Sequence, residues 1–145
     1  MADNLTQSIN AYSNSGAALD PTTSLLASPD GEIQAPQGCN MMNLFIVLSG
    51  TALDNLEVTV GMLRADETVA GDGAAKMAAV NGVSSDVVDL GTGEADYKLT
   101  DAGALTGRYV LSIPVQPYYK YLVSMKRTGG DATSRALGTA DFVAV

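Results

Sequence analysis

The sequence contains no histidine, no tryptophan and only one cysteine among its 145 residues. The absence of histidine removes the usual general base at neutral pH and the commonest metal ligand, so a Ser-His-Asp triad is excluded. A single cysteine, Cys39, excludes an intrachain disulfide and any zinc or iron–sulfur site built from several thiolates. We expect Cys39 to be a small buried residue, because no histidine is there to activate its thiol. The sequence therefore predicts a protein that is not an enzyme, with no catalytic residues, no metal and no cofactor. An enzyme that uses two facing carboxylates in a cleft stays open as an alternative.

Basic residues and long apolar runs are also scarce. Eight Lys and Arg stand against sixteen Asp and Glu, which leaves a net charge of −8 and argues against affinity for nucleic acid or anionic lipid. The longest purely apolar run, Leu44–Leu48, is far shorter than the roughly 20 residues that span a bilayer. The start, Met1–Asn4, lacks the basic region of a secretory leader. We expect a soluble protein of cytosolic origin that binds neither nucleic acid nor membrane.

The length fits one domain, and the composition of the chain changes near residue 40. Apolar residues make up 46% of the sequence and charged residues 17%, a composition that folds. Residues 1–40 are rich in Ser, Thr, Asn, Gln, Pro and Gly and show no sustained apolar period. We predict an extended polar N-terminal arm over residues 1–40, followed by a β-sandwich domain over residues 41–145; a frayed terminus is the alternative for the arm. Deleting residues 1–35 should then leave a folded sandwich with impaired assembly.

From residue 43 onward the sequence consists of short strand-like runs between turn residues. Leu44–Leu48 is continuously apolar, which predicts a strand buried on both faces. A period of two, with one apolar and one polar face, recurs at Leu56–Met62, Arg108–Ile113 and Tyr119–Lys126. Pro114 should end the second of these or place it at an edge, and Gly129–Asp131 predicts a hairpin into a closing strand at Phe142–Val145. Counting weaker segments gives seven to nine strands, so we predict an all-β antiparallel sandwich of jelly-roll type.

Two glycine-rich stretches and several acidic residues resemble ligand-binding motifs only in part. Gly71–Lys76 lacks the spacing of a phosphate loop, and Gly91–Gly93 is better explained as a turn. Clustered carboxylates are the ligands that Ca²⁺ prefers, although no EF-hand spacing is present. The residues considered for calcium are Asp66, Glu67, Asp72, Asp86 and Asp89. A calcium-binding or carbohydrate-binding β-sandwich therefore stays open as an alternative.

Charge and tyrosine are distributed unevenly along the chain. Residues 1–72 hold nine acids and one base, whereas residues 73–145 hold seven of each. Tyr and Arg are enriched at the centres of protein interfaces, and both gather around the predicted final hairpin. The candidate contact residues there are Tyr118, Tyr119, Lys120, Tyr121, Lys126, Arg127 and Arg135, with Ile9, Tyr12, Leu19 and Leu25 as apolar anchors of the arm. The alternative is that Tyr119 and Tyr121 belong to the core and that the lysines are only solvated.

The last third of the chain resembles a known family. Gly107–Val115, with the sequence GRYVLSIPV, is followed by Tyr119–Met125, by a Gly-Gly turn and by a closing strand of small residues. This order resembles the C-terminal pattern of the capsid decoration, or cement, proteins of tailed bacteriophages. The resemblance is best over residues 107–145, and the sequence departs from the pattern in its long polar start and in the Ala/Gly-rich segment 69–93.

The resemblance implies a jelly-roll sandwich that forms an oligomer, often a trimer, on the outside of a phage head. Such a protein is made in the cytoplasm of the bacterial host and clamps neighbouring subunits of the major capsid protein. An enzymatic role is not implied. Within the structural class, a phage tail, fibre or head-completion component is the alternative.

Overall fold

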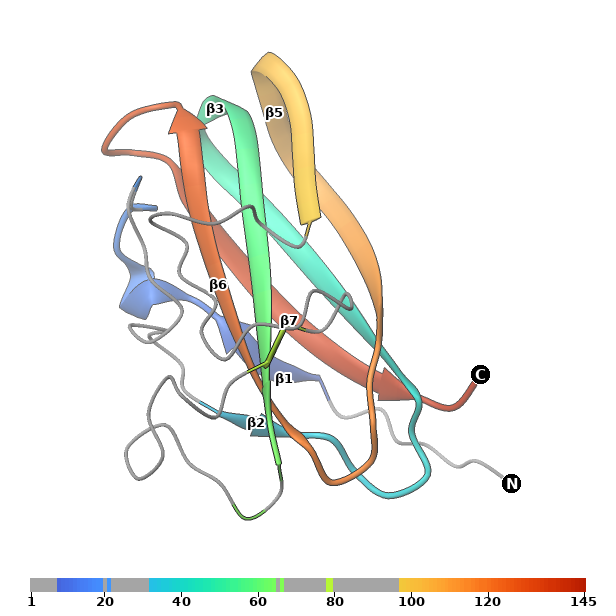
Figure 1. The fold of residues 1–145 in the computed structure, drawn as a ribbon. Coiled ribbons are helices and arrows are strands. Elements are labelled where there is room, and N and C mark those ends of the chain that lie inside the picture. Colours follow the sequence, from blue (N-terminus) through green and yellow to red (C-terminus); the bar gives the residue numbers. More distant parts are fainter. Residues whose placement is uncertain (1–7, 20, 22–31, 65, 67–77, 80–96) are drawn as a thin grey trace.

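The computed structural model describes residues 8–19, 21, 32–64, 66, 78–79 and 97–145 (Figure 1). Its elements are β1 (Ile9–Tyr12), the 3-10 helix η1 (Asn14–Gly16), β2 (Ile33–Gln34), β3 (Met41–Leu63), β4 (Ala78–Ala79), β5 (Tyr97–Pro114), β6 (Lys120–Gly129) and β7 (Arg135–Val143). Every strand pair among these residues is antiparallel, which confirms the predicted all-β antiparallel class. Among the described residues no helix is long and apolar enough to cross a membrane.

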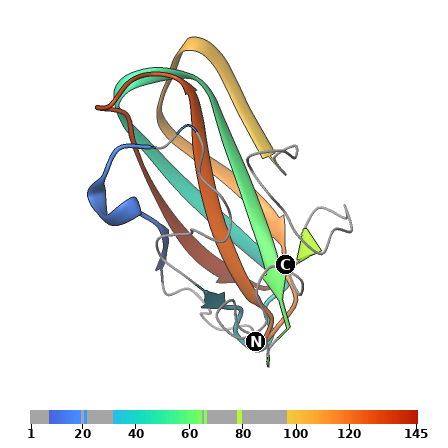
Figure 2. The same ribbon diagram turned by 60° about the vertical axis from the view of Figure 1, so that its left-hand side comes forward.

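Two strands bend so sharply that each contributes to two layers. The pairing of β3 with β5 breaks register between Leu48 and Leu53, and Gly50 at this break has a φ of 78°. Leu48 pairs with Gly107 and Leu53 pairs with Leu105, so β5 bends opposite the bend in β3. Figure 1 and Figure 2 show both ribbons rising in one layer and returning in the other. The two layers are therefore halves of one continuous sheet.

The strand order is that of a jelly roll. In the first layer, residues 41–49 of β3 lie between β7 and residues 107–114 of β5, and β1 lies beyond β7. In the second layer, residues 53–63 of β3 lie between β6 and residues 97–105 of β5, and β2 lies beyond β6. Dividing β3 and β5 into halves and leaving out the two-residue β4 gives eight segments, numbered in chain order as β1, β2, the two halves of β3, the two halves of β5, β6 and β7. In this numbering the strand order is 1-8-3-6 in the first layer and 2-7-4-5 in the second. This interleaving of two Greek keys defines the jelly roll, and it confirms the prediction.

The core lies between the two layers. Alternate residues of the first half of β3, among them Met42, Leu44 and Ile46, are fully buried. A Cβ added to Gly138 of β7 would lie 2.9 Å from Cε of Met125 in β6 and 3.4 Å from Cδ1 of Leu44. The layers approach this closely because glycine carries no side chain, and larger residues fill the space on either side.

The described part of residues 1–40 belongs to the sandwich, so the predicted boundary between arm and domain is wrong there. Ile9 of β1 pairs with Ala140 of β7, and Ile33 of β2 pairs with Tyr121 of β6. Buried residues of this segment are Ala11, Tyr12, Leu19, Ile33, Ala35 and Cys39. The two strands contain only four and two residues, and such short strands leave no apolar period for sequence inspection to detect.

Some of the predictions for individual strands are confirmed and others are wrong. Leu56, Val58 and Val60 are buried as the alternation predicted, but Thr59 on the predicted polar face of β3 and Ser124 on that of β6 are buried as well. Pro114 ends β5 at an edge of the first layer. Gly129–Asp131 does not join a pair of neighbouring strands, because β6 lies in the second layer and β7 in the first. The predicted burial of both faces of Leu44–Leu48 is also wrong, as described below. The glycine-rich stretches 71–76 and 91–93, Leu25, and the calcium candidates Glu67, Asp72, Asp86 and Asp89 lie outside the described residues.

Asp131 organises the turn that carries the chain from one layer to the other. Its Oδ1 accepts hydrogen bonds from the Thr133 amide at 2.8 Å and the Thr133 hydroxyl at 2.7 Å. Its Oδ2 accepts one from the Thr51 hydroxyl at 2.9 Å. These bonds favour the ionised carboxylate, so the Thr133 hydroxyl above all, then the Thr133 amide and Thr51, hold the pKa of Asp131 below its ordinary value of 3.8. The turn is therefore tied to the bend of β3.

Asp131→Asn is expected to destabilise the protein more at pH 7 than at pH 3. A carboxylate with a depressed folded pKa contributes stability above its unfolded pKa, and this contribution is lost as pH falls through the folded value. Urea unfolding of both proteins at the two pH values measures the difference. Asp101→Asn makes the same chemical change at an exposed position of β5 and is the matched control. A pH-independent loss in Asp131→Asn would contradict the role of ionisation.

Candidate interaction surface

The outward side of the first layer carries a contiguous group of exposed apolar side chains. Phe45 pairs directly with Val110 across β3 and β5, and Val47 pairs directly with Leu137 across β3 and β7. Their exposed fractions are 42% for Phe45, 40% for Val47, 54% for Val110 and 45% for Leu137. Side chains on one face of directly paired or next-but-one residues are neighbours, so the four form one patch. We call this patch the outer apolar face.

The local sequence explains why these side chains point outward. Leu44, Ile46 and Leu48 occupy the inward positions of β3, so the intervening Phe45 and Val47 must point away from the core. Contiguous exposed apolar residues rimmed by polar ones are typical of sites that bind another macromolecule. Sequence inspection missed all four residues of the outer apolar face, because a continuous apolar run gives the same pattern whether its second face is buried in the chain or is left for a partner.

Polar residues surround the outer apolar face. Thr139 pairs with Phe45, Arg108 pairs with Val47, and the Ser112 hydroxyl donates a 2.9 Å hydrogen bond to Oδ1 of Asn43. An apolar centre with a hydrogen-bonding rim is the usual anatomy of a protein–protein interface.

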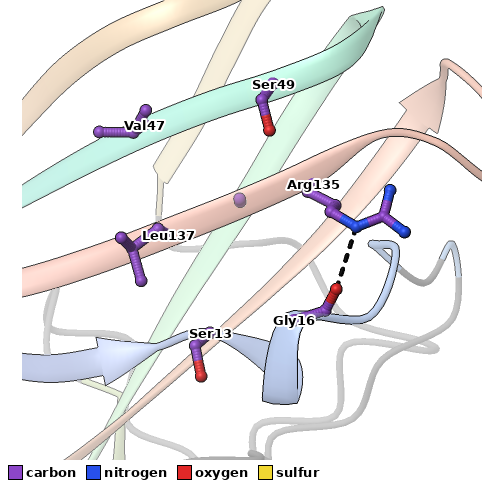
Figure 3. Close-up of a pocket in the computed structure, with 7 residues that line it drawn as sticks. Ser13, Gly16, Val47, Ser49, Arg135 and Leu137 are labelled. Carbon is purple, nitrogen blue, oxygen red and sulfur yellow. Dashed lines mark hydrogen bonds between the residues drawn. The ribbon is translucent and has the colours of Figure 1, made fainter.

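A hollow of about 340 Å³ adjoins the patch between η1 and β7 (Figure 3). Its lining residues are Ser13, Gly16, Val47, Ser49, Arg135, Ala136 and Leu137. The Arg135 guanidinium is held in place, because its Nε donates to the Gly16 carbonyl at 3.0 Å and one terminal nitrogen donates to the Thr133 carbonyl at 2.8 Å. Arg135, a candidate from the sequence, thus lies on the same side of the molecule as the outer apolar face.

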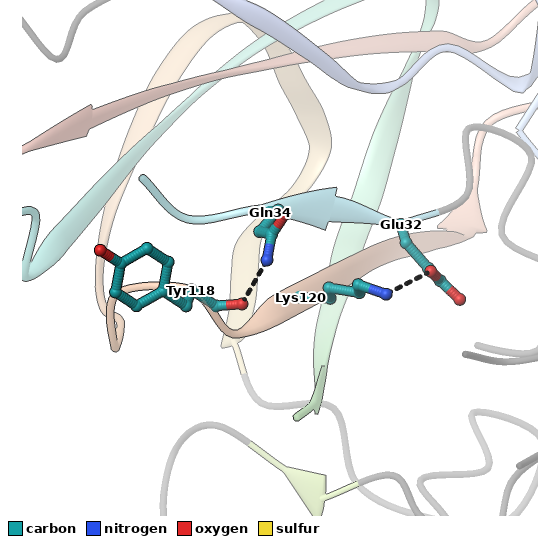
Figure 4. A network of polar contacts seen from close by, with 4 residues as sticks. All are labelled: Glu32, Gln34, Tyr118 and Lys120. Atoms are coloured by element: carbon teal, nitrogen blue, oxygen red, sulfur yellow. Dashed lines mark hydrogen bonds and ion pairs between the residues drawn. The ribbon is translucent and has the colours of Figure 1, made fainter. Parts of the chain in front are cut away.

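The tyrosines near β6 have separate environments. Tyr121 is fully buried, and its hydroxyl accepts a 2.7 Å hydrogen bond from the backbone N–H of Gln116. Burial raises the pKa of this phenol. Tyr119 is partly buried against the core, whereas the Tyr118 side chain is 51% exposed. Tyr118 has a φ of 70°, and its carbonyl accepts a 2.8 Å bond from the Gln34 side chain (Figure 4). Of the three, Tyr118 is the most exposed.

The basic candidates are engaged within the chain. Lys120 forms an ion pair with Glu32 (Figure 4), and its Nζ lies 3.8 Å from the Glu32 carboxylate. Nζ of Lys126 lies 3.5 Å from the Glu57 carboxylate. Arg127 donates from Nε to the Leu19 carbonyl at 2.9 Å and from a terminal nitrogen to the Gly129 carbonyl at 2.7 Å.

The arm candidates are also placed within the sandwich. Tyr12 and Leu19 are core residues and Ile9 packs partly against the core, while Leu25 lies outside the described residues. The structure therefore does not bring the predicted contact residues together on one surface.

The described side chains that bear on catalysis or metal binding are few. Cys39 is buried, and burial raises the pKa of its thiol, which keeps it in the protonated form at neutral pH. Within the described ranges, no group of three or more Cys, Asp or Glu side chains is placed to hold a metal ion. Asp66, the described member of the calcium candidates, is exposed.

No protein-family model and no curated protein sequence matches the chain. Among solved structures, the chain is similar to the K2 cleaved adhesin domain of Lys-gingipain, with 19% identity and a TM-score of 0.34. The similarity covers 79% of this chain and 62% of the adhesin domain, so the chain spans less than two thirds of that domain.

Proposed function

We propose that this chain is a non-enzymatic structural protein that binds the outside of a phage capsid and cements neighbouring subunits of the major capsid protein. The observation that carries the proposal is the outer apolar face, a contiguous apolar patch on a jelly-roll sheet with a polar rim. The resemblance of residues 107–145 to phage cement proteins supports the choice of a capsid as the partner. The net charge of −8 suits a position outside the shell, away from the packaged genome.

The size of the patch determines how such a protein must act. Each of the four side chains is already about half buried, so covering the remainder contributes on the order of 1 kcal/mol apiece. Association itself costs roughly 4–15 kcal/mol, which equals or exceeds that sum. A single copy with this patch alone would bind weakly, and useful affinity requires several linked contacts. A protein that engages several shell subunits at once meets this requirement and stabilises the shell, provided that it binds the assembled lattice and not free subunits.

The test is co-sedimentation of the purified chain with isolated heads of the phage that encodes it. The double variant Val47→Asp, Leu137→Asp should lose binding by at least tenfold, because it places two charges in the apolar contact. Both residues are exposed, so the variant should keep the circular dichroism and thermal midpoint of the parent within a few degrees. Thr100→Asp, on the exposed part of β5 in the second layer, is the matched control and should bind like the parent.

Three outcomes would contradict the proposal. The parent chain could fail to sediment with heads, the double variant could bind as well as the parent, or the protein could sediment with isolated tails instead. The last result would favour the tail or head-completion role.

A further inference from the structure

The second half of β5 forms an open edge of the first layer. Residues 107–114 pair with β3 on one side, and in the described part of the chain no strand pairs with their other side. The Val115 amide donates to the Asn40 carbonyl at 3.1 Å, so the odd-numbered residues of this half-strand direct their backbone groups toward β3. The backbone N–H and C=O groups of Arg108, Val110 and Ser112 therefore point away from the sheet. Pro114, which has no N–H, occupies the next outward position.

The features that usually prevent pairing stand only at the two ends of this edge, at Arg108 and Pro114. Natural sheet edges are protected by charges, prolines, bulges or very short strands. Tyr109–Ile113 contains no charge and no proline, and its register with β3 is unbroken from Met41 to Leu48. The opposite edge of the layer, β1, has only four residues and a register shift between Asn10 and Tyr12. The open edge also continues directly into the outer apolar face through Val110.

We propose that two copies of this chain associate by antiparallel pairing of their β5 edges across a two-fold axis at Val110. In this register Val110 lies opposite Val110 of the second copy, and Arg108 lies opposite Ser112 of the second copy. The inference concerns self-association and stands whether or not the protein binds a capsid. It departs from the trimer that the family resemblance implies.

The residues at the edge select this register over its neighbours. A shift that centres the axis on Arg108 places two like charges opposite each other, which destabilises a sheet. Moving the axis toward the C-terminus places Pro114 opposite Arg108 or Val110 of the second copy. Because proline has no backbone N–H, that pair loses a hydrogen bond. A shift that centres the axis on Tyr109 requires Thr106 to pair, beyond Gly107 with its φ of 91°. An axis at Val110 instead pairs the outward N–H and C=O groups of Arg108, Val110 and Ser112.

The arrangement has a consequence for the outer apolar face. Edge pairing across a two-fold axis joins the first layers of both copies into one continuous sheet, and isologous contacts of this kind give closed dimers. The Val110 side chains then meet at the axis, and the two outer apolar faces lie on the same side of the joined sheet. A dimer would therefore present a doubled patch to any one partner surface.

The proposal is tested by cysteine cross-linking and by mass. Directly opposite residues in a hydrogen-bonded antiparallel pair have Cα atoms about 5.5 Å apart, within the range of about 4.4–6.8 Å that a disulfide spans. Under mild oxidation, Val110→Cys should form a covalent dimer with itself. Arg108→Cys and Ser112→Cys should cross-link with each other when mixed, and each alone should cross-link to itself at least tenfold less. The native Cys39 is buried and serves as the background control in the parent protein.

Light scattering on the full chain gives the independent measurement. We expect a dimer that dissociates on dilution, and a monomer for Val110→Pro, which removes the central outward N–H without touching the bonds to β3. Val110→Thr keeps the N–H and is the matched control that should remain a dimer. Should Val110→Pro not fold, the cross-links still decide the matter. A trimer, a monomer at all concentrations, or self-linking of Arg108→Cys in place of Val110→Cys would overturn the proposal.

Discussion

Removal of residues 1–35 is expected to abolish cooperative folding. The truncation takes away β1 and β2, which pair with β7 and β6, together with the buried side chains of Tyr12, Leu19 and Ile33. Losing large buried side chains costs about 2–5 kcal/mol each, and three of them together approach the roughly 5–15 kcal/mol that stabilises a whole domain. Circular dichroism and a thermal melt of the truncated chain measure the effect, with a featureless melt as the expected result.

Substitutions at Tyr12 separate the packing contribution from the loss of the strands. Tyr12→Ala should lower the free energy of unfolding by about 3–5 kcal/mol, because it empties a fully buried site. Tyr12→Phe keeps the ring and loses only the hydroxyl, whose 3.4 Å bond to the Met125 carbonyl is long, so about 1 kcal/mol or less is expected. A truncated chain that melts cooperatively near the parent midpoint would restore the interpretation of this segment as an arm.

Sequence periodicity revealed the longer strands. Leu56, Val58 and Val60 alternate with Glu57 and Thr59, and the structure buries the three apolar residues as expected, although it buries Thr59 as well. Periodicity revealed neither β1 and β2 nor the way β3 passes from one layer to the other at Gly50. Two to four residues contain too few repeats to define a period, and a bend depends on contacts between residues far apart in the sequence.

The outer apolar face was hidden from sequence inspection for a different reason. The apolar run Leu44–Leu48 correctly predicts a strand. Its hydrophobicity does not distinguish a second face that packs against the chain itself from one that packs against another molecule. Phe45 and Val47 are exposed because residues 41–49 of β3 lie in an outer layer whose second face is open in the described structure. The sequence instead indicated the tyrosines as contact residues, although Tyr121 occupies an inward position in β6.

Charge position along the sequence also differs from charge position in space. The acids are concentrated in the first half and the bases in the second, which suggested two ends of opposite character. Folding brings Lys120 to Glu32 and Lys126 to Glu57, so bases of the second half face acids of the first. Both pairs are partly buried, with side-chain exposed fractions of 16–24%, and their main effect here is to occupy the lysines.

Gly50→Ala is expected to be among the most destabilising single substitutions in the chain. Gly50 has a φ of 78°, a left-handed conformation that costs a residue with a Cβ about 1–2 kcal/mol. The added Cβ would also overlap the carbonyl oxygen of Thr133, a backbone atom in the turn that Asp131 organises. Forced overlap adds about 1–3 kcal/mol, so we expect a total loss of roughly 2–5 kcal/mol in the free energy of unfolding. Urea denaturation monitored by tyrosine fluorescence measures it.

Gly38→Ala is the matched control, since it separates backbone strain from overlap. Gly38 has a φ of 85°, close to that of Gly50, but a Cβ there meets no atom within 4 Å. Its substitution should therefore cost only the conformational term of about 1–2 kcal/mol. The excess loss in Gly50→Ala then measures the contact between the bend of β3 and the turn between β6 and β7. Equal losses in the two variants would mean that this end of the sandwich adjusts freely, and that the two layers are not locked together there.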